Sequence, residues 1–220
     1  MVLLNLLEIP RHPKIYHITH INNLEGILRN KVLWSDAKRL ELGLGCEIVG
    51  MFAIKQRRLE ELEVKCHPGT KVGEYVPFYF CPRSVMLYIL YMGNHPDISY
   101  HEGQTPIVHL QADLMASIQW AEKHNVRWAF SDRNAGERIA NFYKGVDKFN
   151  RVNWPAVAAT DWRDIIIQEG KQAEFLVYES FPWELVEKIG VRDNIVRQNI
   201  IEKLTRENQS LVSVEPSWYY

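Results

Sequence analysis

The chain has 220 residues, of which 46% are hydrophobic and 24% are charged, so it has the composition of an ordinary globular protein with enough length for a sizeable core. Its formal net charge of −1 at pH 7 excludes a protein that coats nucleic acid by bulk electrostatics, although a local basic face is still allowed. No apolar run approaches the roughly 20 residues that a membrane-spanning helix needs. The apolar beginning lacks a basic stretch and a small-residue cleavage site, so we expect no signal peptide.

Cysteine usage indicates a reducing compartment. Cys46, Cys66 and Cys81 are odd in number and irregularly spaced, which predicts free thiols and a cytoplasmic location. A zinc cluster around Cys66 and His67 would need a Cys-x-x-Cys or His-x₃-His pair, and because neither occurs we expect no metal. The sequence has no repeats, low-complexity tracts or obvious linkers, so we expect residues 1–220 to form a single domain.

The first part of the chain predicts a strand followed by helices and a loop. Residues 14–21 read as a short strand, and residues 22–28 as a helix with apolar positions facing inward. Residues 31–50 contain three glycines and no clean period, which favours a mobile loop. Residues 51–64 predict a further helix.

The middle of the chain mixes strands and helices. Residues 75–80 predict a strand, which Pro77 should confine to a sheet edge or a bulge because proline cannot donate a ladder hydrogen bond. Residues 83–92 predict a largely buried helix, residues 107–110 a core strand, and residues 112–123 a short helix.

The last part continues without regular strand–helix alternation. We expect strands over 128–131 and 172–178, a long and only partly helical segment over 132–172, and a last helix over 192–206. This mixture predicts an α+β, or mixed α/β, fold.

A lone carboxylate lies in the strand predicted over residues 172–178. Glu174 is flanked by apolar and aromatic residues, although Glu is depleted in strands. Because an unpaired buried carboxylate costs several kcal/mol, such a residue is usually exposed at a sheet edge, paired, or employed in chemistry. All three interpretations are open from spacing alone.

Several familiar motifs can be excluded. His17-Ile18-Thr19 would suggest a phosphodiesterase only if a second His-x-Thr tripeptide were present, and none is. A Gly-x-Ser-x-Gly elbow, a Gly-x-Gly-x-x-Gly turn and a Walker loop are also missing. What remains is His17 and Thr19 on an early strand, Arg58 on a helix, and Glu174 on a late strand. Each of these signals is weak by itself, because a lone histidine on a strand is more often a satisfied polar group and an arginine on a helix is more often a solvated charge.

Four blocks of the sequence, taken together, resemble the DarT family of DNA ADP-ribosyltransferases. The blocks are residues 15–28 (IYHITHINNLEGIL), 56–58 (QRR), 75–84 (YVPFYFCPRS) and 171–177 (KQAEFLV). The first and third are the most specific, because long mixed strings of aromatic and polar residues rarely recur by chance.

The resemblance implies an ADP-ribosyltransferase-like fold with a central split β-sheet and flanking helices. It also implies an enzyme that splits NAD, its co-substrate, and attaches ADP-ribose to a base of single-stranded DNA, most often thymine. The implied catalytic residues are Glu174 and Arg58, with Arg57 the alternative for the arginine. The implied NAD contacts are His17, Ile18, Thr19, Gly26, Leu33 and Arg58. Family members are toxins paired with a DarG-type macrodomain antitoxin, and we expect this chain to be a monomer.

These residue types suit the implied chemistry. Breaking the nicotinamide–ribose bond develops positive charge on the ribose, as in glycoside cleavage. A fixed carboxylate such as Glu174 stabilises that charge more than it stabilises the neutral ground state. Arginine is effectively always protonated and is a poor general base. We therefore expect Arg58 to lower the cost of a thymine N3 anion and to orient the NAD phosphates.

The segment before Glu174 is expected to contact DNA. Basic residues outnumber acidic ones there, and aromatic residues are interleaved as faces on which single-stranded bases could stack. An ordinary charged surface over core aromatics explains the same pattern. The expected DNA contacts are Arg133, Asn134, Lys144, Arg151 and Lys171.

Two other functions fit the sequence. An enzyme of the same fold could act on guanine, RNA, protein or water, since the charge is neutral and the basic patch is weak. A DNA-binding or partner-binding module without catalysis is the second alternative, although the presence of His17, Arg58 and Glu174 argues against it.

Overall fold

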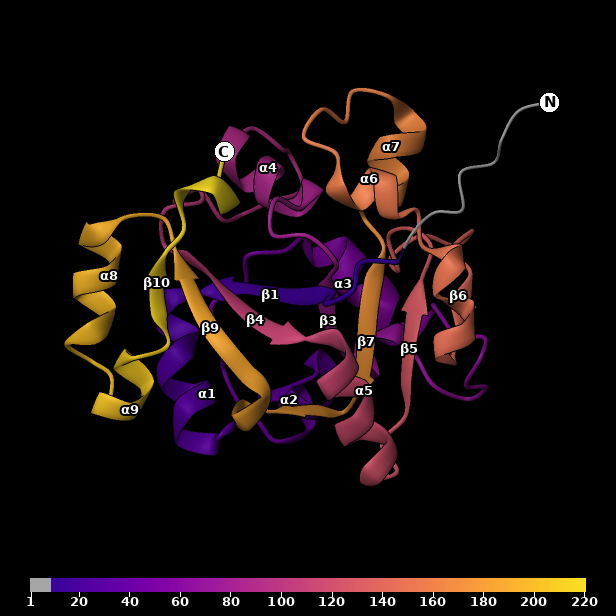
Figure 1. The fold of residues 1–220 in the computed structure, drawn as a ribbon, viewed down its shortest axis with the longest axis horizontal. Coiled ribbons are helices and arrows are strands. Elements are labelled where there is room, and N and C mark those ends of the chain that lie inside the picture. Colours follow the sequence, from indigo (N-terminus) through magenta and orange to yellow (C-terminus); the bar gives the residue numbers. More distant parts are fainter. Residues whose placement is uncertain (1–8) are drawn as a thin grey trace.

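The computed structural model describes residues 9–220, and a mixed eight-stranded sheet runs through it (Figure 1). The spatial order of its strands is β10-β9-β4-β1-β3-β7-β5-β6, and only the β9–β10 pair is parallel. The strands are β1 (Lys14–His20), β3 (Tyr75–Tyr79), β4 (Ile107–Asp113), β5 (Trp128–Ser131), β6 (Phe142–Tyr143), β7 (Glu174–Tyr178), β9 (Val186–Val191) and β10 (Val212–Val214). A second sheet pairs β2 (Val32–Trp34) with β8 (Ser180–Pro182).

Short helices surround this sheet. In chain order they are α1 (Leu24–Asn30), α2 (Asp36–Glu41), α3 (Phe52–Glu60), α4 (Val85–Met92), α5 (Leu114–Lys123), α6 (Trp154–Ala158), α7 (Ile165–Gly170), α8 (Asn194–Ile201) and α9 (Arg206–Gln209). Helices α8 and α9 lie beside β10, whereas α6 and α7 lie together near the start of β7 (Figure 1). Within residues 9–220, no helix has both the length and the apolar composition that a membrane span requires.

The sheet is split between β1 and β3. Strand β1 pairs with β4 along its whole length, and β3 pairs with β7 along its whole length. Between β1 and β3 the register consists of a single residue pair, Tyr16 with Tyr79. The two strands therefore diverge beyond Tyr16 and open a gap in the middle of the sheet.

Pro77 explains how this gap is tolerated. The prediction that Pro77 confines residues 75–80 to an edge or a bulge is wrong, because β3 lies inside the sheet. The Pro77 carbonyl oxygen accepts a hydrogen bond from the His17 ring of β1 at 2.8 Å. Since the nitrogen and carbonyl of a strand residue face the same side, the missing N–H of Pro77 also faces the split, where no ladder bond is required.

Several predicted boundaries differ from the structure. Residues 31–50 were expected to be a loop, but they contain β2 and α2, and Ser35 caps α2 by accepting a hydrogen bond from the Lys38 backbone. Strand β4 extends to Asp113, whose side chain caps α5, so that helix begins later than predicted. Helix α3 ends at Glu60, and the predicted helix over 192–206 is replaced by α8 and α9.

Candidate active site

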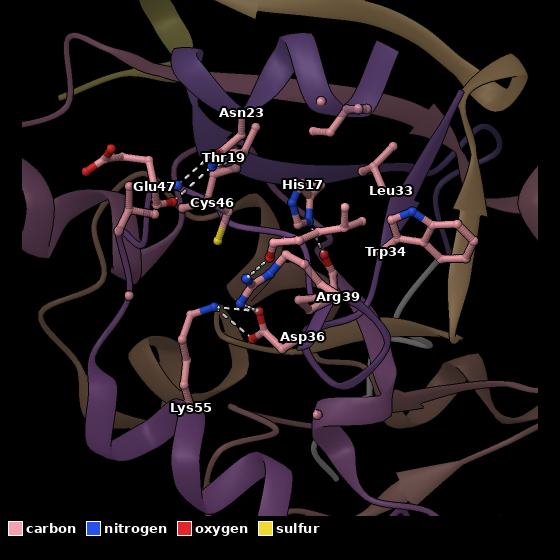
Figure 2. A pocket seen from close by; sticks show the side chains of 18 of the residues that line it. His17, Thr19, Asn23, Leu33, Trp34, Asp36, Arg39, Cys46, Glu47 and Lys55 are labelled. Carbon is pink, nitrogen blue, oxygen red and sulfur yellow. Dashed lines mark hydrogen bonds and ion pairs between the residues drawn. The ribbon is translucent and has the colours of Figure 1, made fainter. Parts of the chain in front are cut away.

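A cavity of about 620 Å³ occupies the split between β1 and β3 (Figure 2). Residues of β1 and β3 line it, and α1, β2, the segment from α2 to α3, and one side of α4 complete its wall. The divergence of the two strands thus provides a site whose floor is rigid sheet and whose rim includes short helices and loops.

All six expected NAD-contact residues line this cavity. They are His17, Ile18 and Thr19 on β1, Gly26 on α1, Leu33 on β2 and Arg58 on α3. A Cβ atom added to Gly26 would meet no protein atom within 4 Å, so the helix presents bare backbone here. The structure therefore brings together residues that are far apart in the sequence.

His17 is held as a neutral acceptor. Its Nδ1 must carry the proton, because it lies 2.8 Å from the Pro77 carbonyl oxygen, which can only accept. Burial lowers the pKa of His17, outweighing the hydrogen bond to Pro77 and the charge of Asp36. The second ring nitrogen, Nε2, is then a neutral acceptor, suited to a ligand hydroxyl or amide N–H.

Glu174 is paired with Arg58. The guanidinium donates to Oε1 at 3.2 Å and to Oε2 at 2.9 Å. The side chain of Glu174 is 2% exposed and that of Arg58 is 14% exposed. The backbone N–H of Ala135 donates to Oε1 at 2.9 Å, and the backbone N–H of Glu174 donates to the Ser131 hydroxyl. Glu174 is therefore a buried, oriented carboxylate and not an exposed edge residue.

The pair lies in the cavity wall. Arg58 lines the cavity, and so do Tyr79 and Gln172, whereas Glu174 itself is covered. Burial alone would lower the pKa of Arg58, but the Glu174 carboxylate outweighs it and raises that pKa. Arg57, the alternative arginine, turns elsewhere and donates to the Gly136 carbonyl at 3.4 Å. The structure thus selects Arg58 as the partner of Glu174.

Tyr79 is a cavity residue that the sequence did not single out. It lies opposite Glu174 in the β3–β7 register. Burial, and then the Glu174 carboxylate, raise the pKa of its hydroxyl, so the phenol stays protonated. Its signal was present in the aromatic string over 75–80, but strand alternation alone cannot say which of those rings faces a cavity.

A polar network closes the rim and was also missed (Figure 2). Lys55 of α3 pairs with Asp36 of α2 at 2.7 Å, and Arg39 lies 3.6 Å from the same carboxylate. Burial would raise the pKa of Asp36, but Lys55 and then Arg39 and Arg58 outweigh it and lower that pKa. Asn23 joins Thr19 to the backbone of Glu47. Asp36, Arg39 and Glu47 of this network lie within residues 31–50, which were expected to form a loop.

The expected DNA contacts divide into three groups. Asn134 lines the cavity and donates to Gln172 at 3.2 Å, and Arg133 pairs with Glu169 at 3.1 Å, so both lie near the start of β7. Lys144 and Arg151 are exposed and lie away from the cavity lining.

Lys171 does not fit the expectation of a DNA contact. It is 3% exposed, and its ammonium donates to the carbonyl oxygens of Val157 at 3.2 Å and Ala159 at 2.8 Å. Two of the interleaved aromatic residues, Phe149 and Trp154, are likewise buried in the core. The sequence pattern of cations and rings therefore mixes surface positions with structural ones.

The chain is similar to known DNA ADP-ribosyltransferases. A family model described as "ssDNA thymidine ADP-ribosyltransferase, DarT" matches residues 16–220. A "DNA ADP-ribosyl transferase" of Thermus sp. (strain 2.9) is 37% identical over 219 residues, covering 96% of this chain and 98% of the relative. A "DNA ADP-ribosyl transferase-DNA ADP-ribosyl glycohydrolase fusion protein" of Thermosipho africanus is 24% identical over 217 residues, covering 96% of this chain and 50% of the fusion.

Solved structures of DarT proteins are also similar to this chain. "Thermus sp. 2.9 DarT in complex with ADP-ribosylated ssDNA" superimposes with a TM-score of 0.83 at 35% identity, covering 96% of this chain and 98% of that one. "Thermus sp. 2.9 DarT in complex with NAD+" gives a TM-score of 0.79 at 34% identity, covering 97% and 100%. The fold is that of a DNA ADP-ribosyltransferase. The chain belongs to the DarT family of single-stranded-DNA thymidine ADP-ribosyltransferases, as the four sequence blocks predicted.

Proposed function

We propose that this chain transfers ADP-ribose from NAD to a thymine base of single-stranded DNA and releases nicotinamide, as the toxin of a toxin–antitoxin pair. The observation that carries the proposal is the Arg58–Glu174 pair in the wall of a cavity of about 620 Å³ at the sheet split. The Thermus relative has been solved with NAD+ and with ADP-ribosylated single-stranded DNA, which supports both substrates.

NAD is proposed to bind across the sheet split. His17 offers a neutral acceptor and Thr19 a hydroxyl to its ribose and amide groups, while Gly26 lets it approach the α1 backbone closely. Ile18 and Leu33 supply apolar contacts. Arg58 presents the cation that the diphosphate requires. The cavity volume lies within the usual range for sites that enclose a ligand of this kind.

In the proposed reaction the bond between ribose C1′ and the nicotinamide nitrogen breaks, and its electron pair leaves with neutral nicotinamide. A new bond forms between C1′ and N3 of thymine, and the N3 proton leaves to a base. The Glu174 carboxylate stabilises the positive ribose between these events and is a suitable proton acceptor. Its position on a strand, with three hydrogen bonds from Arg58 and Ala135, orients it in advance.

Arg58 is proposed to act as a cation and not as a base. Its pKa is raised by Glu174, so it holds its proton throughout. It positions the carboxylate through two hydrogen bonds and lowers the cost of a thymine N3 anion beside it. This role agrees with the poor basicity expected of any arginine.

DNA is proposed to approach the start of β7. Arg133 and Asn134 lie there beside Gln172, and the exposed side chains of Lys144 and Arg151 are available for phosphate contacts. Lys171 is left out of this proposal because its ammonium is buried on backbone carbonyls.

We further propose that residues 1–220 form one domain that acts in the cytoplasm as a monomer, without a metal. Its partner is proposed to be a DarG-type macrodomain antitoxin that removes the modification. The Thermosipho fusion, which joins a DNA ADP-ribosyl transferase to a DNA ADP-ribosyl glycohydrolase, supports that pairing.

Labelled NAD tests the acceptor class. The enzyme is incubated with label on the adenylate and with single-stranded DNA, RNA or a protein mixture in separate reactions. Label in DNA that contains thymine, but not in DNA without it, is the expected result. Label in thymine-free DNA, RNA or protein would support an enzyme of the same fold with another acceptor. NAD that stays intact in every reaction would support a binding module without catalysis.

A further inference from the structure

A second cavity, of about 290 Å³, lies beside the proposed acceptor site. Two chain segments connect the cavities. Tyr79 and Gln172 line the first, and their immediate neighbours Phe80 and Lys171 line the second. Both segments meet where β3 ends and β7 begins with Glu174. The two cavities therefore share these two chain segments, which lie next to Glu174.

The charge of the second cavity suits a polyanion. Arg83 and Lys171 line it, and no aspartate or glutamate is among its lining residues in the described part of the chain. Lys171 is committed to backbone carbonyls, so Arg83 is the available cation. The buried Nε of Arg83 has no hydrogen-bond partner within residues 9–220, and its guanidinium carbon lies 4.3 Å from the centroid of the Tyr220 ring.

Aromatic rings border the same cavity. Phe80 and Trp162 line it, and Trp162 packs against Tyr88 of α4 with ring centroids 4.9 Å apart. Tyr220 joins this cluster at 6.2 Å from Trp162 and 5.1 Å from Tyr88. Trp162 lies on the connection between α6 and α7, is partly exposed and lines the cavity.

We propose that this cavity binds a nucleotide next to the acceptor thymine of the single-stranded DNA substrate. Its base stacks on Trp162, and its phosphate meets Arg83. A volume of about 290 Å³ suits one nucleotide better than a helix or strand of a protein partner. The inference rests on the proposed function, and it gives Arg83 and Trp162 a role in holding the strand beside the thymine.

The test uses single-thymine oligonucleotides in which the nucleotide on either side of the thymine is replaced, one at a time, by an abasic residue. The enzymes are the unaltered protein, Arg83→Gln, Trp162→Phe and Trp162→Ala, with Arg206→Gln on exposed α9 as a matched charge control. NAD binding without DNA is measured for each, so that a misfolded variant is recognised.

With the unaltered protein and Arg206→Gln, one abasic replacement should slow transfer about tenfold, which is the effect of losing one stacked base. Trp162→Ala should transfer about tenfold more slowly to the intact oligonucleotide and be insensitive to that abasic replacement, while Trp162→Phe keeps most of the sensitivity. Arg83→Gln should weaken the salt dependence of DNA binding.

Two results would overturn the proposal. One is an unaltered protein that modifies every oligonucleotide at the same rate. The other is a set of variants that slow all oligonucleotides by one common factor. If the proposed function is wrong, the unaltered protein will modify none of the oligonucleotides. That result would also contradict the nucleotide subsite.

Discussion

Arg58 and Glu174 are separated by 116 positions in the sequence, yet their side chains meet through two hydrogen bonds in the cavity wall. One belongs to a helix at the rim and the other to the first residue of β7. Because the pair is nearly buried, its charges must compensate each other, and removing one residue leaves the other without an opposite charge. Structural and chemical roles are therefore coupled in these two residues.

A double-mutant cycle separates the two roles of Arg58. If Arg58 acts only by positioning Glu174, the Arg58→Ala and Glu174→Gln double variant should transfer ADP-ribose no more slowly than Glu174→Gln alone. If Arg58 also stabilises the thymine anion, as we propose, the double variant should be slower by about tenfold or more. Single-turnover rates measure this.

Stability in the same cycle is a second readout. Arg58→Ala leaves a buried carboxylate without its cation and should lower the free energy of unfolding by about 3–5 kcal/mol. The double variant, which contains no unpaired charge, should recover part of that loss. An Arg58→Ala variant as stable as the unaltered protein would contradict the buried pair.

Substitution of Gly26 tests whether NAD binds in the cavity at the sheet split. A leucine at this position would extend into the cavity, because a Cβ on Gly26 meets no protein atom within 4 Å. We expect Gly26→Leu to lower NAD affinity at least tenfold without lowering the melting temperature, since glycine is a poor helix residue. Gly26→Ala is the control and should have a smaller effect. Unchanged NAD affinity in Gly26→Leu would place NAD elsewhere.

His109 should make the stability depend on pH. It is fully buried, and burial lowers its pKa to about 4 from the ordinary value of 6.5, outweighing its hydrogen bond to Pro82. Between these values the unfolded chain binds a proton that the folded protein does not. Stability should therefore fall as the pH falls from 6.5 to 4, by about 3 kcal/mol from this residue.

Chemical denaturation at several pH values checks this. His109→Gln keeps an N–H donor for Pro82 but does not titrate, so its stability should change less over the same range. Equal slopes for the two proteins would show that other groups are responsible.

Substitution of Lys171 tests whether this residue is a structural cation or a DNA contact. Lys171→Met should lower the free energy of unfolding by about 1–3 kcal/mol, because the carbonyl oxygens of Val157 and Ala159 lose their donor. The salt dependence of DNA binding should be unchanged. Arg151→Met, on the surface, should have the opposite pattern, with unaltered stability and a smaller salt slope. A reduced salt slope in Lys171→Met would restore Lys171 as a DNA contact.

The sequence predicted the parts of the molecule that depend on local pattern. The early strand with His17 and Thr19, the late strand with Glu174, and the mixed α+β class were all confirmed. The six expected NAD-contact residues line one cavity, and their contact with NAD stays a prediction. The identities of these six residues were predicted from the resemblance of four sequence blocks to the DarT family, whose fold this chain shares.

What could not be predicted depends on neighbours in space. Pro77 suggested an edge strand, and only the opening between β1 and β3 shows why an interior strand tolerates it. Lys171 looked like a surface cation because nothing local reveals the carbonyl oxygens that bind its ammonium. Residues 31–50 looked like a loop because β2 and α2 are too short to show a period.

The central claim is that Glu174 drives transfer of ADP-ribose from NAD to thymine. Mass spectrometry of a single-thymine oligonucleotide after incubation with enzyme and NAD tests it most directly. We predict an ADP-ribose adduct on thymine with the unaltered protein, and a rate about 10²- to 10³-fold lower with a folded Glu174→Gln variant. Glutamine keeps an acceptor for Arg58, so the fold should survive. A thymine adduct formed at the same rate by Glu174→Gln, or an adduct found only on another base, would contradict the account.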